Sequence, residues 1–207
     1  MASPRLVVAT RSPHKLRELR EILPGIELDQ LPDHVDLPPE DGDSFAANAL
    51  TKARAARAAI GIAAIGDDSG IEARALGGRP GVRSARYAGP GATDEENLAL
   101  LISELDGVAE RAVAYVCAIA LVGDAGDELV FEGRCEGELS PEPRGSGGFG
   151  YDPAFVPRDT GPRDQRTMAE LGATEKHAIS HRGRAARLLA SHLGVPPATA
   201  PVTGAGP

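Results

Sequence analysis

Short apolar runs alternate with polar, glycine-rich breaks along the chain, and this pattern predicts alternating strands and helices. Residues 5–10 and 26–31 have the aliphatic and β-branched character of short buried strands. Residues 63–66 form a third apolar run, which stops at Asp67-Asp68-Ser69-Gly70. We therefore expect this strand to end there in a tight loop, and a separate short strand to follow over residues 71–76.

Four segments combine helical spacing of apolar residues with recognisable start signals. The signals are Ser12 before Pro13, Ser44 before a long alanine-rich stretch, the capping box that Thr93 opens, and Ser180 before the last amphipathic segment. The expected helices cover residues 13–23, 44–60, 94–105 and 181–193.

The second half of the chain predicts antiparallel pairing. Residues 111–122 are almost continuously apolar, as expected for a central strand that is buried on both faces. A turn over residues 124–126 and a second run over 128–135 complete a long hairpin. The fold class that follows is α/β, with a mixed sheet.

Residues 145–150 fit the dinucleotide pattern G-x-G-x-x-G letter for letter, but no helix signal follows them, so we reject that interpretation. The glycines are better suited to let the backbone approach a ligand closely, with Phe149 and Tyr151 beside it for a base to stack on. A glycine-rich hairpin without a binding role is the alternative.

Composition sets limits on this picture. The chain has 207 residues with 42% hydrophobic content, which suits one domain or two lobes sharing one sheet; we expect the domain over residues 1–194 and a disordered tail over 195–207. A net charge of −8 argues against a general nucleic-acid surface. No apolar stretch reaches the ~20 residues of a membrane helix. Two cysteines make no disulfide framework, so a cytoplasmic location is expected.

Several polar groups have the character of a phosphate and metal site. Asp67 and Asp68 are adjacent carboxylates at a predicted strand end, where ligands bind in open α/β sheets, and a hard cation such as Mg²⁺ suits them. Glu40 could supply a third carboxylate. A solvated acidic turn is the alternative for the pair.

The chain has only three lysines among its 22 basic residues, so each could mark a place that requires a compact ammonium. Lys15 follows a strand–loop–helix start, which is a natural anion site, although the glycines of a Walker loop are missing. Lys52 shares a helical face with Asn48, and Lys176 precedes a helix start where donors could meet phosphate or a base carbonyl. Ordinary surface lysines are the alternative.

These stretches together resemble the Ham1/RdgB family, the pyrophosphatases of non-canonical purine nucleoside triphosphates. The resemblance spans roughly residues 5–194 in the family's order. The motifs that carry it are Ser44-Phe45-x-x-Asn48-Ala49-x-x-Lys52-Ala53, Asp67-Asp68-Ser69-Gly70, Gly77-Gly78-x-Pro80-Gly81, Ser84-Ala85-Arg86-Tyr87, Gly147-Gly148-Phe149-Gly150-Tyr151-Asp152-Pro153 and Lys176-x-x-x-Ser180-His181-Arg182.

The resemblance implies an elongated α/β fold with a mixed sheet flanked by helices, two lobes with a central cleft, and a homodimer. It implies Mg²⁺-dependent hydrolysis of a purine nucleoside triphosphate to the monophosphate and pyrophosphate. Asp68 would be the catalytic base and would hold the metal with Glu40. The residues that would contact substrate are Thr10, Arg11, Ser12, Pro13, His14, Lys15, Lys52, Ser69, Phe149, Gly150, Tyr151, Asp152, Lys176, His181 and Arg182.

The first motif departs from the family, since Ser12 occupies a usual Asn position and Arg11 replaces a common Gly. This stretch is also faintly similar to the Maf nucleotide pyrophosphatases, whose other signatures are absent. A Maf-like enzyme for pyrimidine or modified nucleotides, and a nucleotide-sensing module without turnover, are therefore the alternatives.

Overall fold

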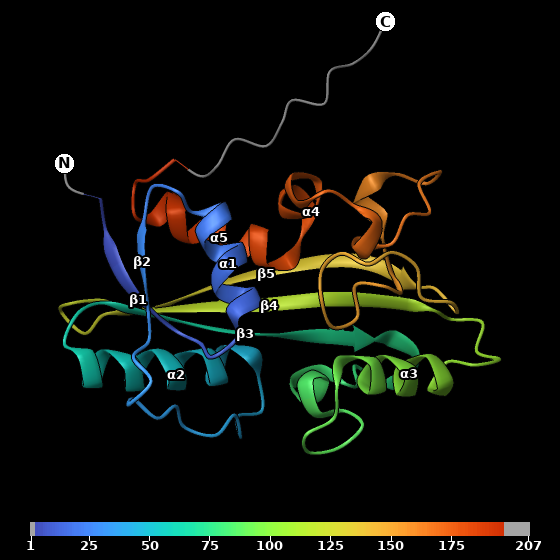
Figure 1. Ribbon diagram of the computed structural model, residues 1–207, viewed down its shortest axis with the longest axis horizontal. Coiled ribbons are helices and arrows are strands. Elements are labelled where there is room, and N and C mark those ends of the chain that lie inside the picture. Colours follow the sequence, from blue (N-terminus) through green and yellow to red (C-terminus); the bar gives the residue numbers. More distant parts are fainter. Residues whose placement is uncertain (1–2, 197–207) are drawn as a thin grey trace, which may run out of the picture.

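A six-stranded mixed sheet runs through the length of the molecule, with the strand order β2-β1-β3-β4-β5-β6 (Figure 1). The computed structural model describes residues 3–196 of the chain. The strands are β1 (Arg5–Ala9), β2 (Glu27–Gln30), β3 (Ala64–Ala73), β4 (Ala112–Val122), β5 (Glu128–Leu139) and β6 (Phe155–Pro157). β1 pairs with β2 and β3 in parallel, and the remaining pairings are antiparallel, so the predicted mixed sheet and the β4–β5 hairpin are confirmed.

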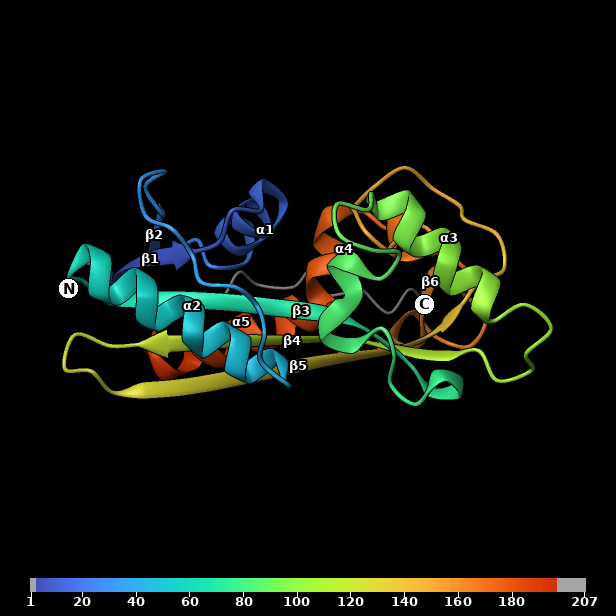
Figure 2. The same ribbon diagram turned by 90° about the horizontal axis from the view of Figure 1, so that it is seen from below.

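Helices cover both faces of this sheet. The α-helices are α1 (Pro13–Ile22), α2 (Phe45–Ile60), α3 (Asp94–Glu104), α4 (Ala173–Ile179) and α5 (His181–His192). α1, α4 and α5 lie on one face, and α2 and α3 follow one another along the other face (Figures 1 and 2). α2 and α3 belong to opposite ends of the long strands, which gives the predicted elongated two-lobed shape.

The helix starts lie where the sequence signals place them. The Ser12 hydroxyl accepts a hydrogen bond from the Lys15 amide, and the Ser44 and Ser180 hydroxyls cap α2 and α5 in the same way. Thr93 forms the predicted capping box of α3. These caps satisfy amide groups that a helix end leaves without a partner. The short helix α4 is an addition that the sequence pattern does not predict.

The strand β3 corrects one prediction, because the chain does not turn at residues 67–70. β3 continues without interruption to Ala73 and pairs with β4 along its whole length. β1, in contrast, pairs only with residues 64–66 and ends there. The small and polar residues 67–70 therefore lie in an extended strand beyond the end of β1, and of the separate strand expected over 71–76, only 71–73 are strand.

The close approach of α2 to β3 depends on Gly66. A Cβ at this position would lie 2.1 Å from the Ala49 carbonyl oxygen of α2. Any side chain would push the helix away from the sheet, so Gly66 fixes the distance between β3 and the helix that carries Asn48 and Lys52.

Val195 packs against the core formed by α1, α5 and the sheet. The predicted tail falls mainly on residues 197–207, which lie outside the described residues, so that prediction stays untested. Within residues 3–196, no helix has the combined length and apolar character that spanning a bilayer requires.

Candidate active site

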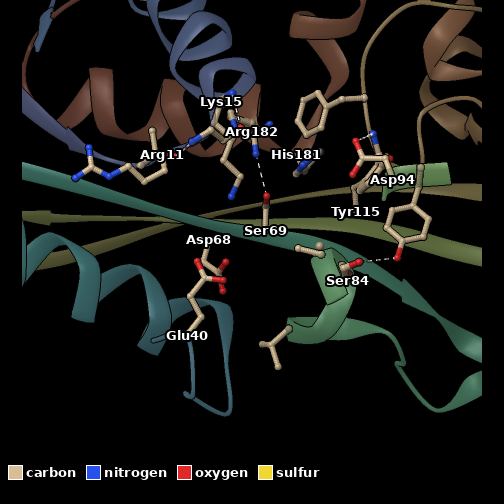
Figure 3. Close-up of a pocket in the computed structure, with 18 of the residues that line it drawn as sticks. Arg11, Lys15, Glu40, Asp68, Ser69, Ser84, Asp94, Tyr115, His181 and Arg182 are labelled. Atoms are coloured by element: carbon tan, nitrogen blue, oxygen red, sulfur yellow. Dashed lines mark hydrogen bonds between the residues drawn. The ribbon is translucent and has the colours of Figure 1, made fainter. Parts of the chain in front are cut away.

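A cavity of about 380 Å³ opens at the end of β1, between the two lobes (Figure 3). Its wall includes every residue that the family resemblance implies for substrate or metal except Pro13 and His14, and it does not include Asp67. Pro13 is exposed at the first position of α1, and the His14 ring stacks on the Phe149 ring at 5.3 Å. Additional lining residues are Leu37, Pro38, Gly70, Val82, Ser84, Ala85, Asp94 and Tyr115.

All three lysines of the chain lie at this cavity, and each ammonium contacts a carboxylate. Lys15 Nζ lies 2.6 Å from Asp67 Oδ1, and Lys52 Nζ lies 2.5 Å from Glu40 Oε1. Lys176 Nζ contacts Asp152 at 2.8 Å. Since these lysines come from three different helices, the fold gathers them into one site of positive charge for an anionic ligand.

Asp67 and Asp68 lie on opposite faces of β3, so the expectation that they jointly bind one cation is wrong. Successive side chains of a strand point to opposite sides, and only a turn would have let the two carboxylates converge. Asp67 contacts Lys15 of α1 and Arg182 of α5, whereas Asp68 contacts helix α2 on the other side.

The Asp67 carboxylate belongs to a buried ion network. It is fully inaccessible to solvent and lies 3.0 Å from Arg182 Nε. Burial opposes its ionisation, but Arg182 and Lys15 outweigh that effect and hold the pKa of Asp67 well below its usual range. The Asp67 carboxylate therefore favours its ionised form and contacts two cations of the cavity, Lys15 and Arg182.

The Asp68 carboxylate is buried but faces the cavity. Its Oδ2 accepts a hydrogen bond from Asn48 Nδ2 at 2.9 Å, and its Oδ1 lies 3.6 Å from Lys52 Nζ. Burial raises the pKa of Asp68 despite the attraction of Lys52. A carboxylate with a raised pKa in a cleft has the character of a general base.

Glu40 lies beside Asp68, because both carboxylates contact the ammonium of Lys52 (Figure 3). Burial opposes ionisation of Glu40, but Lys52 outweighs it and lowers the Glu40 pKa. Within residues 3–196, no three His, Cys, Asp or Glu side chains converge as a complete metal site. Two neighbouring carboxylates do suit Mg²⁺, which is commonly held by one or two carboxylates together with substrate phosphates and water.

The other end of the cavity carries an aromatic ring next to cations. The Phe149 ring has Lys176 Nζ at 5.1 Å from its centroid and Arg182 Cζ at 5.8 Å. Ser69 Oγ accepts a hydrogen bond from Arg182 at 2.9 Å. Such a combination of an aromatic ring and hydrogen-bond donors suits a nucleobase with carbonyl groups.

His181 lies below this region, stacked on the Tyr115 ring at 4.6 Å. Burial holds the pKa of His181 well below its usual value, so the imidazole is neutral. Its Nδ1 is buried and has no hydrogen-bond partner among the described residues, although the ring borders the cavity. This nitrogen is closed to solvent, so a ligand in the cavity would meet other atoms of the ring.

Three predicted residues of the cavity wall use their side-chain polar groups in hydrogen bonds within the protein. Thr10 Oγ1 accepts from the Ser12 amide, and the Ser12 hydroxyl caps α1. Tyr151 donates its hydroxyl hydrogen to the Ser84 carbonyl at 2.8 Å. Their contribution to the cavity is therefore shape and backbone, together with the ring of Tyr151.

Arg11 also differs from the prediction. Its guanidinium points away from the cavity and donates to the carbonyls of Leu31 at 2.9 Å, Pro32 at 3.0 Å and Val35 (Figure 3). The substrate contact expected of this side chain is not supported by its position, because its donors hold the loop between β2 and α2.

Glu18 and Tyr115 are two residues of the site that sequence reasoning missed. Glu18 of α1 is buried and contacts Lys176 at 2.7 Å and Arg182 at 2.6 Å. The Tyr115 hydroxyl lies 3.2 Å from Asp152 Oδ1. Signals did exist: Glu18 lies three positions after Lys15 on one helical face, and a tyrosine in a buried central strand needs a partner for its hydroxyl.

Comparison with known proteins shows the family of the chain. The model of the Ham1 family matches residues 6–192. The chain is 50% identical over 197 residues to a dITP/XTP pyrophosphatase of Geobacter sulfurreducens, covering 92% of this chain and 96% of that protein. A dITP/XTP pyrophosphatase of Mycobacterium tuberculosis is 49% identical over 194 residues, covering 89% and 93%.

Solved structures give the same result for the fold. A HAM1 protein from Coxiella burnetii superposes with a TM-score of 0.82 at 39% identity, covering 92% of this chain and 98% of that one. A nucleoside-triphosphatase, dITP/XTP pyrophosphatase, from Mycobacterium abscessus gives 0.71 at 44% identity, covering 91% and 99%.

Proposed function

The chain belongs to the Ham1 family, and we infer from this membership and from the cavity that it hydrolyses non-canonical purine nucleoside triphosphates. The substrates are dITP, ITP, XTP and dXTP, and the products are the monophosphate and pyrophosphate. The observation that carries the proposal is the convergence of Lys15, Lys52 and Lys176 with Glu40 and Asp68 around one cavity. Three ammonium groups around the cavity and two carboxylates beside one of them suit a triphosphate accompanied by a divalent cation.

Asp68 is the proposed general base. A water molecule would attack the α-phosphorus and give its proton to the Asp68 carboxylate, while the bond from that phosphorus to the bridging oxygen breaks and the electron pair leaves with pyrophosphate. Asn48, which donates to Asp68 Oδ2, would keep the other carboxylate oxygen directed at the water. The raised pKa of Asp68 makes its carboxylate a better proton acceptor than an exposed aspartate.

Mg²⁺ is the proposed cofactor, and Glu40 and Asp68 would hold it. When bound, this ion would neutralise phosphate charge and orient the leaving pyrophosphate. Lys52 lies between the two carboxylates and balances their charge, which allows both to remain close together before substrate arrives.

The base is proposed to stack on Phe149. A ring N–H of His181 and backbone amides near Tyr151 would donate to the O6 carbonyl of a 6-keto purine. Adenine presents an amino group at that position, which would leave these donors without an acceptor. Such a mismatch at buried donors discriminates strongly between substrates.

A nucleotide panel with pyrophosphate detection tests the proposal. ITP, dITP and XTP should release pyrophosphate with Mg²⁺ and stop when EDTA is added, and ATP should react far more slowly. Equal rates for ATP and ITP would contradict the base assignment. A preference for pyrimidine or modified nucleotides would favour a Maf-like enzyme, and binding without release of pyrophosphate would favour a sensing module.

We also propose a homodimer in the cytoplasm, because the family resemblance implies both. Sedimentation velocity of the full chain measures the first of these directly. A single species at the monomer mass across the micromolar range would contradict the dimer.

A further inference from the structure

The loop over residues 145–150 forms part of the cavity wall although its composition favours disorder. Four of its six residues are glycine, and Gly145, Gly148 and Gly150 have positive φ angles. Residues 145–148 are exposed. Glycine loses more conformational freedom on ordering than any other residue, so this loop depends on specific contacts to hold its position.

Three backbone amides of the loop provide such contacts. The Gly147 amide donates to the Ala169 carbonyl at 3.0 Å, and the Phe149 amide donates to Asp152 Oδ2 at 2.9 Å. The Gly150 amide donates to Asp94 Oδ2 at 2.8 Å (Figure 3). Asp94 is the first residue of α3, 56 positions earlier in the chain, so this bond joins the loop to a helix of the opposite sheet face.

The Asp94 carboxylate is not needed by its own helix. The start of α3 is capped by the reciprocal bonds between Thr93 and Glu96, which satisfy the amides of these two residues without Asp94. The carboxylate lies instead at the edge of the cavity. We call this hydrogen bond, from the Gly150 amide to the exposed Asp94 carboxylate, the clamp of the glycine-rich loop.

Phe149 is the residue that this clamp would control. It immediately precedes Gly150, and its ring stacks on His14 and lies 5.1 Å from Lys176 Nζ and 5.8 Å from Arg182 Cζ. A rotation of the peptide at Gly150 would carry the ring out of that place, because a glycine with a positive φ has little intrinsic barrier to other conformations.

We propose that Asp94 is a positioning residue for the base subsite. By accepting the hydrogen bond from the Gly150 amide, it holds Phe149 in the stacking position before the nucleotide arrives. The proposal rests on the proposed function, in which a purine stacks on Phe149. Preorganisation lowers the free energy needed to order the loop on binding, so the effect falls on KM more than on kcat.

The test compares Asp94→Ala, Asp94→Asn and, as a control in the same helical turn, the exposed Glu95→Ala. Hydrogen–deuterium exchange of the segment 145–151 in nucleotide-free protein reports the loop directly, and steady-state kinetics with ITP report its consequence. Asp94→Ala should speed exchange in that segment and raise KM about 5- to 30-fold, with kcat within about 3-fold of the parent. Asp94→Asn, which keeps an acceptor oxygen, should stay within about 3-fold in KM. Glu95→Ala should match the parent.

Other outcomes overturn the proposal. Unchanged exchange together with a raised KM in Asp94→Ala would mean that Asp94 contacts the substrate itself. An unchanged KM in Asp94→Ala would mean that the hydrogen bond between Asp94 and the Gly150 amide has no role in binding. An equal rise in KM in Asp94→Asn and Asp94→Ala would mean that the charge of Asp94 matters, and not the hydrogen bond. Hydrogen–deuterium exchange is measured without nucleotide, so it tests the contact between Asp94 and the loop independently of activity. A protein that does not hydrolyse ITP would overturn the proposed function, and the exchange result would still support or contradict that contact.

Discussion

Glu18 and Arg182 lie 164 positions apart in the chain, and their side chains meet at 2.6 Å in a buried ion pair. Lys176 contacts the same carboxylate at 2.7 Å. Lys176 and Arg182, which are proposed to face the nucleotide, are therefore both bound by Glu18 of α1. This arrangement keeps their positions fixed when the cavity holds no ligand.

Glu18→Gln should lower the stability of the protein in a pH-dependent way. Burial opposes ionisation of Glu18, but Arg182 and Lys176 outweigh it and lower its pKa from 4.5 to about 2. The stabilisation by the carboxylate is thus fully present above pH 4.5 and is lost as the pH falls toward 2.

Urea unfolding of the parent and the Glu18→Gln variant at pH 7, 4.5 and 3 measures this effect. The difference in unfolding free energy should be about 2–4 kcal/mol at pH 7 and should shrink below pH 4.5. Glu21→Gln, on the same helix but half-exposed, is the control and should change stability by less than about 1 kcal/mol. A Glu18 variant with a constant difference at all three pH values would contradict the ion pair.

Asp67→Asn should destabilise the fold. Removing this fully buried charge leaves Lys15 and Arg182 with one carboxylate fewer, and breaking a buried ion pair costs about 3–5 kcal/mol. Chemical denaturation at pH 7 measures the loss. A variant as stable as the parent would show that the network can rearrange around the amide.

Asp68→Asn should abolish most of the activity while leaving the stability of the fold nearly unchanged. Loss of a general base lowers turnover about 10²- to 10⁴-fold, while the neutral amide is tolerated because burial already disfavours the charge at this position. Pyrophosphate release from ITP, together with the thermal midpoint, checks both parts. Near-parent turnover would reject Asp68 as the base, and a large drop in the midpoint would assign it a structural role.

Arg11→Ala should weaken the loop between β2 and α2 rather than substrate binding. The lost donors serve the carbonyls of Leu31, Pro32 and Val35, so we expect a loss of about 1–3 kcal/mol in stability and a KM for ITP within about 3-fold of the parent. Arg11→Lys should not restore stability, since one ammonium cannot reproduce the planar fork. A 10-fold rise in KM at unchanged stability would show that Arg11 binds substrate after all.

Much of the secondary structure follows from local sequence. Ser12 with Pro13, Ser44 and the Thr93 capping box set helix starts through bonds that span three residues, so a short window of sequence contains the whole interaction. The two apolar runs on either side of residues 124–126 form the predicted hairpin for the same reason. The rarity of lysine also identified three positions at the cavity.

The tertiary structure decided what the local pattern left open. Asp67-Asp68-Ser69-Gly70 has the composition of a turn, but β4 pairs along the entire segment and keeps it extended, which separates the two carboxylates onto opposite faces. Glu18 became part of the site only because α1 packs beside α4 and α5, more than 150 positions away.

The sequence by itself thus determined the family, most of the strands and helices, and most of the charged residues of the cavity. Only the folded chain determined which charged groups face that cavity and which are buried beside it in ion pairs with the cavity residues. The physical reason is that capping and periodicity are short-range, whereas the direction and burial of a charged side chain depend on strands and helices that the chain brings together from distant positions.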